Sequence, residues 1–331
     1  MTKWDFKIKQ LEHNIDSFDS SKLKLDISGK DVNYTIVNSL RKVCTDQIPI
    51  YAFHRGKIKI LRNSSVYDRT EMEIRLSQLP IKRVLPGPVF LPLKYYKNVN
   101  FADLKLERHL ADTTDIECYI NIKNKGPEKV LYVTANEHMR ISVNNKVIDN
   151  NIMYKGIEPI TLIQLRVGEE FECSMKGVLG VGEINAIFNA SNSYYEELDQ
   201  NHYEFIIESN GQMDEYELLR RGITIIIEKL NIIKKNIQEL QYNSITTENN
   251  SIKIIMTNED YTCGGPLNYI LQGMDEVIFS GLSQPNLMEK NIALTCVFAK
   301  GYKTEIILAK GIDKTVEMFE HLGKIIEEIK K

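Results

Sequence analysis

The chain has few of the residues on which metal centres depend. Its five cysteines are scattered, and no two of them lie at the spacing of a metal-ligand pair. They are Cys44, Cys118, Cys173, Cys263 and Cys296. The six histidines show no paired spacing either. Lone cysteines are typical of a reducing compartment, where the thiol is a small buried apolar group. We therefore expect no metal and no cofactor.

Long apolar runs and an excess of one charge are also missing. The longest apolar run, Ile223-Thr224-Ile225-Ile226-Ile227, is far shorter than the roughly 20 residues that cross a bilayer. The first residues are polar and lack the apolar core of a signal peptide. With 42 basic and 45 acidic residues, the net charge of −3 gives no overall attraction to nucleic acid. We expect an intracellular protein that is not bound to a membrane.

Catalytic patterns are absent as well. The run Gly177-Val178-Leu179-Gly180-Val181-Gly182 is rich in glycine, but it lacks the Gly-Lys-Ser/Thr ending of a phosphate loop, so a turn is the better interpretation. No Asp-rich triad of the kind that holds catalytic magnesium occurs. The sequence predicts a chain that is not itself an enzyme. A phosphate-binding enzyme that uses this glycine run is the weakest of the alternatives.

What the chain does contain is one short pattern that occurs twice, about 227 residues apart. Each copy is an apolar run, a polar turn and then a helical pattern, which is predicted over residues 34–45 in the first copy. The turn holds Asn33 and Thr35 in the first copy and Asp260 and Thr262 in the second, and these side chains can cap the helix that follows. The repeat predicts two related units that need each other's surface.

Each half ends in a long amphipathic stretch. Apolar residues recur there at steps of three and four, which predicts a helix with one continuous apolar stripe. The stripes are Ile223, Ile226, Leu230, Ile233, Ile237 and Leu240 in the first half, and Ile312, Val316, Phe319, Leu322, Ile326 and Ile329 in the second. Burying one such side chain is worth roughly 1.5–3 kcal/mol, so each stripe needs a partner. The pattern alone leaves open whether that partner is the unit's own sheet or the other helix.

The residues of the repeat carry a family resemblance. The first copy, Asn33-Tyr34-Thr35-Ile36-Val37-Asn38-Ser39-Leu40-Arg41-Lys42, resembles the large alpha-type subunit of cellular RNA polymerases: bacterial alpha, archaeal D or the eukaryotic third subunit. The second, Asn258-Glu259-Asp260-Tyr261-Thr262-Cys263-Gly264, is similar to the small partner, archaeal L or the eukaryotic eleventh subunit. The chain looks like a fusion of the two, an arrangement that resembles some large DNA viruses. Relatives with a metal cluster in the insert have cysteines that are absent here.

The resemblance implies an α+β fold in which two dimerisation units form an intramolecular pseudo-dimer, with a mostly β insert. We expect the large unit at residues 1–62 plus 183–240, the insert at 63–182, a linker at 241–251 and the small unit at 252–331. Strands are predicted at 57–61, 117–122, 129–133 and 203–208. The family's packing favours a helix-on-helix joint between the two stripes, and no homodimer is expected because the joint is satisfied within the chain.

The function implied by the resemblance is that of a non-catalytic assembly platform in a multisubunit DNA-dependent RNA polymerase. Its partners would be the largest and second-largest subunits and small accessory subunits, with DNA and RNA contacted only through the complex. Arg41 and Lys42 stand where the family presents a basic pair to a large subunit. The sequence alone favours an ordinary solvated face for them, and the resemblance favours the contact. Location follows the source: a cytoplasmic viral factory or virion if viral, and otherwise the nucleus. The alternative is a stand-alone module that binds nucleic acid or a transcription factor.

Overall fold

The computed structural model describes residues 4–15, 21–101, 113–126, 129–148, 153–154, 158–238, 245–248, 250–301 and 304–330. These residues form antiparallel sheets and helices, which confirms the predicted α+β class. Two separate apolar cores are present: one runs through both dimerisation units, and the other fills the insert. Among the helices described, none is long and apolar enough to span a membrane.

The large unit is built on a four-stranded antiparallel sheet with the order β1-β2-β11-β10. Its strands are β1 (Lys7–Ile15), β2 (Ser21–Ser28), β10 (Ser191–Asp199) and β11 (His202–Ser209). Helices α1 (Tyr34–Asp46) and α5 (Glu215–Gln238) pack on this sheet. The sequence analysis missed β1, because this edge strand is mostly polar and exposed and shows little apolar alternation.

The small unit repeats this plan with the sheet order β12-β13-β15-β14. Its strands are β12 (Ile245–Glu248), β13 (Ser251–Thr257), β14 (Val277–Ser283) and β15 (Asn291–Phe298). Its helices are α6 (Tyr261–Gln272) and α7 (Thr304–Lys330). Strand β12 lies inside the segment predicted to be a linker, so that prediction was wrong for residues 245–248: they pair with β13 as an edge strand.

The insert holds a five-stranded antiparallel sheet with the order β3-β9-β4-β6-β7 and a two-stranded sheet of β5 and β8. The strands are β3 (Ile50–Asn63), β4 (Ile116–Lys123), β5 (Val130–Thr134), β6 (Met139–Val143), β7 (Lys146–Ile148), β8 (Thr161–Arg166) and β9 (Glu170–Gly180). The short helices are α2 (Arg69–Ser77), η1 (Leu93–Tyr95) and α3 (Ala135–His138). A further short helix, η3 (Ala186–Phe188), follows the insert, and its Phe188 lies in the core of the dimerisation units. The predicted strand 57–61, placed in the large unit, is part of β3 and pairs with β9, so the insert's sheet already begins at Ile50.

Most of the glycine run interpreted as a turn is the end of strand β9, which reaches Gly180, and the turn begins only at Gly182. A Cβ on Gly180 would lie 2.8 Å from the ring of Phe188, and one on Gly177 would lie 2.9 Å from the Cβ of Ile116. Glycine is needed here because neighbouring side chains approach the strand closely. This packing role accounts for the glycines without a phosphate.

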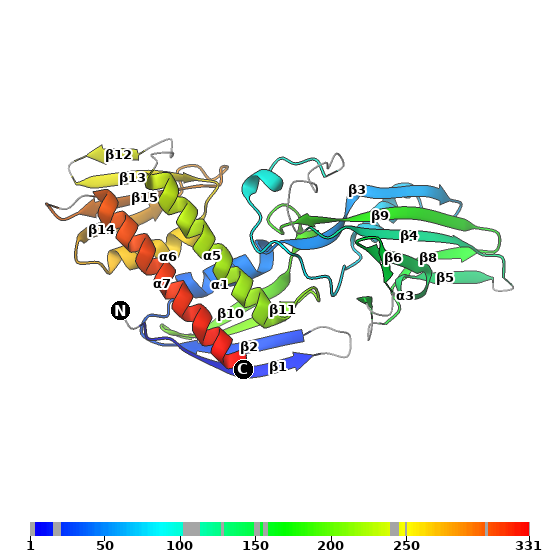
Figure 1. Ribbon diagram of the computed structural model, residues 1–331, viewed down its shortest axis with the longest axis horizontal. Helices are drawn as coiled ribbons and strands as arrows, with labels where there is room; N and C mark the ends of the chain where they lie inside the picture. The colour runs from blue at the N-terminus through cyan, green and yellow to red at the C-terminus, as the bar shows by residue number, and fades with distance from the viewer. Residues whose placement is uncertain are drawn as a thin grey trace.

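In space, the insert's sheet extends to one end of the molecule, and the long helices α5 and α7 lie side by side at the other (Figure 1). Among the contacts that hold the insert against the large unit are those of two polar side chains, Gln212 and Arg221. The amide of Gln212 accepts from the backbone N–H of Tyr51 (3.0 Å) and donates to its carbonyl (2.6 Å), as a neighbouring strand would. The buried guanidinium of Arg221 donates to the carbonyls of Pro86 (2.8 Å) and Pro88 (3.2 Å).

Candidate functional site

The candidate site is the joint between the two units, which is the surface along which the large and the small unit pack. It begins at the two repeated turns. Asn33 is the N-cap of α1: its side chain accepts from the backbone N–H groups of Thr35 (2.9 Å) and Ile36 (3.2 Å). Asp260 is the N-cap of α6 and accepts from the N–H of Thr262 (2.9 Å). Capping satisfies donors that the first helical turn leaves free. The two threonines therefore take part through their backbone N–H groups.

Helices α1 and α6 cross at the centre of the joint, where one hydrogen bond links the halves. The hydroxyl of Ser39, which is 1% exposed, lies 2.6 Å from the carbonyl oxygen of Thr262. Pro266 stands four residues after Thr262 and has no N–H, so that carbonyl lacks the donor it would normally have in a helix. The hydroxyl of Ser39 in the large unit takes the place of the missing donor. Its single proton is shared with the carbonyl of Thr35 in its own helix, which also lies 2.6 Å away.

The proline of the second repeat lies beyond the first turn of its helix, where a missing N–H would cost nothing: Pro266 is the sixth residue of α6. Ser39 offsets this cost from across the joint. Gly265 also suits the joint, because a Cβ there would lie 3.4 Å from the Cβ of Thr35. Gly265 and Pro266 therefore fit the close crossing of α1 and α6.

Each long helix packs against one of the two crossing helices at a glycine: α5 against α1, and α7 against α6. A Cβ on Gly222 of α5 would lie 2.8 Å from the Sγ of Cys44 in α1. A Cβ on Gly311 of α7 would lie 2.5 Å from the Cδ2 of Leu271 in α6. Leu271 follows Cys44 by the same interval, about 227 residues, that separates the two caps. The repeat seen in the sequence is therefore a repeat of helix contacts as well.

The predicted stripes lie at the joint. Helices α5 and α7 contact each other, and α7 also reaches strand β1 of the large unit (Figure 1). The stripe residues that are fully buried in the shared core are Ile223, Ile226, Leu230, Ile233, Ile237, Ile312, Phe319, Leu322 and Ile326. Val316 and Ile329 are partly buried against it, and Leu240 lies outside the described residues. Of the two partners left open by the pattern, α5 uses both, because it packs on its own sheet and on α7.

Ion pairs at both ends show that α5 and α7 run antiparallel. Lys330, at the end of α7, lies 3.2 Å from Asp214, just before the start of α5. Lys234, near the end of α5, lies 2.6 Å from Asp313 in the first half of α7. Exposed pairs of this kind are worth little individually, on the order of 0–1 kcal/mol. These two pairs identify the register in which the apolar stripes of α5 and α7 pack together.

A more buried group of charges crosses the joint beside the start of α6. The ammonium of Lys42 lies 2.5 Å from the carboxylate of Asp260. Lys290 lies 2.7 Å from Glu183 of the large unit and 3.6 Å from Asp260. Lys229 of α5, whose side chain is only 9% exposed, lies 3.4 Å from Glu259. Three pairs thus connect residues of the two units.

Burial and neighbouring charge oppose each other within this group. Burial disfavours the charge on Asp260, yet Lys290 and Lys42 hold its pKa well below the ordinary value. Burial also disfavours the charge on Lys229, but Glu259 raises its pKa above the usual range. Asp46 differs from Asp260: burial raises its pKa to about 6, with Lys42 offsetting only part of the effect. One oxygen of Asp46 is buried with no hydrogen-bond partner among the described residues.

The two residues expected to contact a large subunit differ in their surroundings. Lys42 forms an ion pair with Asp260 of the small unit, so its charge already has a partner at the joint. Arg41 is half-buried, and its Nε donates to Asn38 one turn earlier (3.0 Å). Within the described part of the chain, no carboxylate forms an ion pair with Arg41. An outward contact is therefore simpler to assign to Arg41 than to Lys42.

Metal-ligating groups do not gather in the residues that the structure describes. No three His, Cys, Asp or Glu side chains are placed there as a metal would require. All five cysteines are buried as free thiols. Burial raises the pKa of Cys44 and of Cys173 to about 12, which keeps both thiols protonated. These thiols act as small apolar groups of the cores.

Several residues of the joint were missed in the sequence. Ser39 is an ordinary helix residue until the proline across the joint is known. Lys290 and Glu183 lie far apart in the chain and near no recognisable motif. Lys229 did offer a signal, because it stands three residues after Ile226 and four before Ile233, on the apolar stripe itself. A lysine in that position predicts a buried carboxylate partner.

A repeated unit that packs its capped helix and its long helix against its own second copy defines the class of internally paired dimerisation proteins. The profile described as "RNA polymerase Rpb3/Rpb11 dimerisation domain" matches residues 26–230, and a second profile with the same description matches residues 251–324. The chain belongs to this family and carries two of its domains in one polypeptide. The recognition of two fused alpha-type units is thereby confirmed.

Similar proteins are found in a virus, an archaeon and an animal. The chain is 28% identical over 318 residues to the "Putative DNA directed RNA polymerase subunit R470" of Acanthamoeba polyphaga mimivirus, which covers 88% of this chain and 85% of that one. It is 22% identical over 192 residues to "DNA-directed RNA polymerase subunit Rpo3" of Methanocaldococcus jannaschii, covering 58% and 79%. It is 30% identical over 102 residues to "Probable DNA-directed RNA polymerases I and III subunit RPAC2" of Caenorhabditis elegans, covering 30% and 71%.

Proposed function

We propose that the chain is the assembly platform of a multisubunit DNA-dependent RNA polymerase, a non-catalytic subunit that holds the two largest subunits together. The observation that carries this proposal is the single apolar core that runs through both dimerisation units. Such a core fixes the two units relative to each other, and so fixes whatever each unit binds. The likeness to polymerase subunits in a virus and an archaeon supports the same role.

The mechanism is binding. The joint is closed by apolar burial, the Ser39 hydrogen bond and the buried ion pairs, so the outer surfaces of the two units face their partners in a fixed relation. We assign Arg41 to the contact with a large subunit. Lys42 has a supporting role, because it fixes Asp260 at the start of α6. Small accessory subunits and the site of transcription in a viral factory or virion belong to the same proposal.

The test is to co-express the tagged chain with the two largest polymerase subunits encoded by the same genome. We expect all three proteins to copurify in equal amounts. The variant Arg41→Glu should fold normally and capture less of one large subunit, and Arg166→Glu, which reverses an exposed arginine of the insert, is the matched control. Equal capture of the large subunits by Arg41→Glu and Arg166→Glu would contradict the role assigned to Arg41. A well-folded chain that emerged alone would favour the stand-alone binding module instead.

A further inference from the structure

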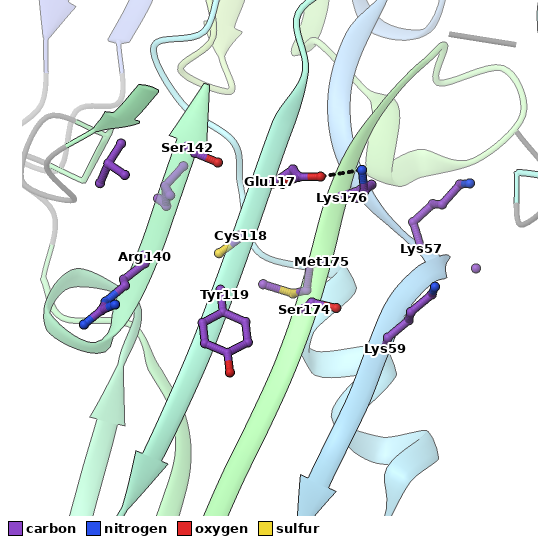
Figure 2. Close-up of a pocket in the computed structure, with 13 residues that line it drawn as sticks. Lys57, Lys59, Glu117, Cys118, Tyr119, Arg140, Ser142, Ser174, Met175 and Lys176 are labelled. Atoms are coloured by element: carbon purple, nitrogen blue, oxygen red, sulfur yellow. Dashed lines mark ion pairs between the residues drawn. The ribbon is translucent and has the colours of Figure 1, made fainter. Parts of the chain in front are cut away.

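The outer face of the insert's five-stranded sheet carries a hollow of about 540 Å³. Figure 2 shows the side chains that line it, which come from all five strands of the sheet, in the order β3, β9, β4, β6 and β7. One row crosses the sheet in register: Lys59 lies opposite Ser174, Ser174 opposite Tyr119, and Tyr119 opposite Arg140. The size is that of pockets that bind small molecules or short segments of chain. This hollow is far from the joint and belongs to none of its contacts.

The lining is predominantly cationic. It holds Lys57, Lys59, Arg140 and Lys176 against a single lining carboxylate, Glu117. Glu117 pairs with Lys176 across the strands, as the dashed line in Figure 2 marks. In the described part of the chain, Lys57, Lys59 and Arg140 form no ion pair. A cationic face with net charge of about +3 has thus gathered on a protein whose overall charge is −3.

We propose that this face binds an extended acidic segment of another protein. Alternate residues of an extended segment lie roughly 6.8 Å apart, and Lys57 and Lys59 are likewise alternate residues of strand β3. Two carboxylates at alternate positions can therefore meet both lysines. Arg140, across the sheet, offers the forked donor geometry that holds a further carboxylate through two hydrogen bonds. The proposal concerns a second binding surface and does not depend on the role in the polymerase.

Nucleic acid fits this face less well. Single strands are held by base stacking on several aromatic rings, whereas Tyr119 is the one aromatic residue lining the hollow, and its hydroxyl donates to Glu172. Glu172 points to the same face of the sheet, four residues along β9 from the Lys176 that pairs with Glu117, and it pairs with Arg62 (3.3 Å). A continuous row of phosphates would approach both carboxylates. A peptide can place uncharged residues opposite them.

The experiment uses the full-length chain and three fluorescent probes: a 12-residue peptide of alternating Glu and Ser, the same peptide with Gln for Glu, and a 12-nucleotide oligothymidine. Anisotropy is measured at an ionic strength of about 50 mM, where exposed charges are weakly screened. We expect the acidic peptide to bind more tightly than the other two. The triple variant Lys57→Gln, Lys59→Gln, Arg140→Gln should weaken its binding by roughly tenfold.

A matched triple variant removes the same charge elsewhere: Lys9→Gln, Lys253→Gln and Lys324→Gln, all at exposed positions on other elements. This control variant should change the dissociation constant of the acidic peptide less than twofold. The single variant Glu117→Gln should strengthen binding, because it removes the carboxylate opposed to the segment, and Glu196→Gln on β10 should not. The proposal is overturned if both triple variants lose binding equally, if neither does, or if oligothymidine binds the face more tightly than the acidic peptide.

Discussion

At the scale of single residues, the halves depend on each other through the hydrogen bond from Ser39 to the carbonyl of Thr262. The variant Ser39→Ala leaves that buried carbonyl without a donor, which should cost about 1–3 kcal/mol in the free energy of unfolding. In a Pro266→Ala background the helix N–H is restored, so the same substitution should cost less than about 1 kcal/mol. Urea unfolding of the four proteins gives the coupling directly. An equal cost in both backgrounds would show that Pro266 and Ser39 are independent.

A second residue, Asp46, makes the stability depend on pH. Burial raises its folded pKa to about 6 from the ordinary value of 3.8, so the folded state holds its proton more tightly than the unfolded state. Ionising it therefore costs stability, and the cost grows as the pH rises from about 4 to 6 and is constant above that. Asp46→Asn should stabilise the chain by up to about 3 kcal/mol at pH 7.5, with the gain fading toward pH 4. Unfolding of Asp46→Asn and of the exposed control Asp115→Asn across this range is the measurement; parallel pH profiles for the two would contradict it.

At the scale of elements, helix α7 contains two glycines in contrasting surroundings. A Cβ on Gly323 would lie at an ordinary contact distance of 3.6 Å from Ile223, whereas one on Gly311 would lie 2.5 Å from the buried Leu271. Gly323→Ala should stabilise the chain by roughly 0.5–1 kcal/mol through helix propensity. Gly311→Ala gains the same propensity but overpacks the joint, and a net loss of about 1–3 kcal/mol is expected. Thermal unfolding compares the two, and a gain for Gly311→Ala would mean that α6 and α7 separate readily.

The elements that could be predicted are those whose signal is local. The helix expected over 34–45 is α1 (Tyr34–Asp46), because its cap and its apolar spacing lie within one segment. The strand expected over 203–208 is β11 (His202–Ser209), which is buried at the centre of its sheet. Strands β1 and β12 were missed because edge strands need few apolar side chains. The pairing of β3 with β9 joins segments more than 100 residues apart, and no local pattern carries it.

Only the features of the joint that recur in both units could be predicted from the sequence. The capping pairs and the apolar stripes follow from spacing, which explains why Asn33, Asp260 and the isoleucines of α5 could be singled out. The charges that cross the joint could not, because Lys290 and Glu183 meet only after both units have folded. The same holds for Ser39, whose partner is a carbonyl in the other unit. The packing of one segment can be predicted from its own residues, whereas contacts between distant segments cannot.

At the scale of the whole molecule, fusion makes the joint intramolecular. Two units linked in one chain face each other at an effective concentration that can reach the millimolar range, without any added contact. The apolar stripes are already covered, so a second copy of the chain has no open joint to bind. We expect the purified chain to be a monomer by light scattering across a range of concentrations. A stable homodimer would mean that the units exchange partners between chains.

The last prediction separates what the link contributes from what the joint contributes. A protease site introduced between α5 and β12 allows the folded chain to be cut into its two original units. Nine stripe residues are buried in the shared core, and those that the joint covers contribute roughly 1.5–3 kcal/mol each, against an association cost of about 4–15 kcal/mol. The cut halves should therefore stay together on gel filtration at micromolar concentration. Their unfolding midpoint should rise with protein concentration, whereas that of the intact chain should not. Separation of the halves would show that the link, more than the joint, keeps the two units in register.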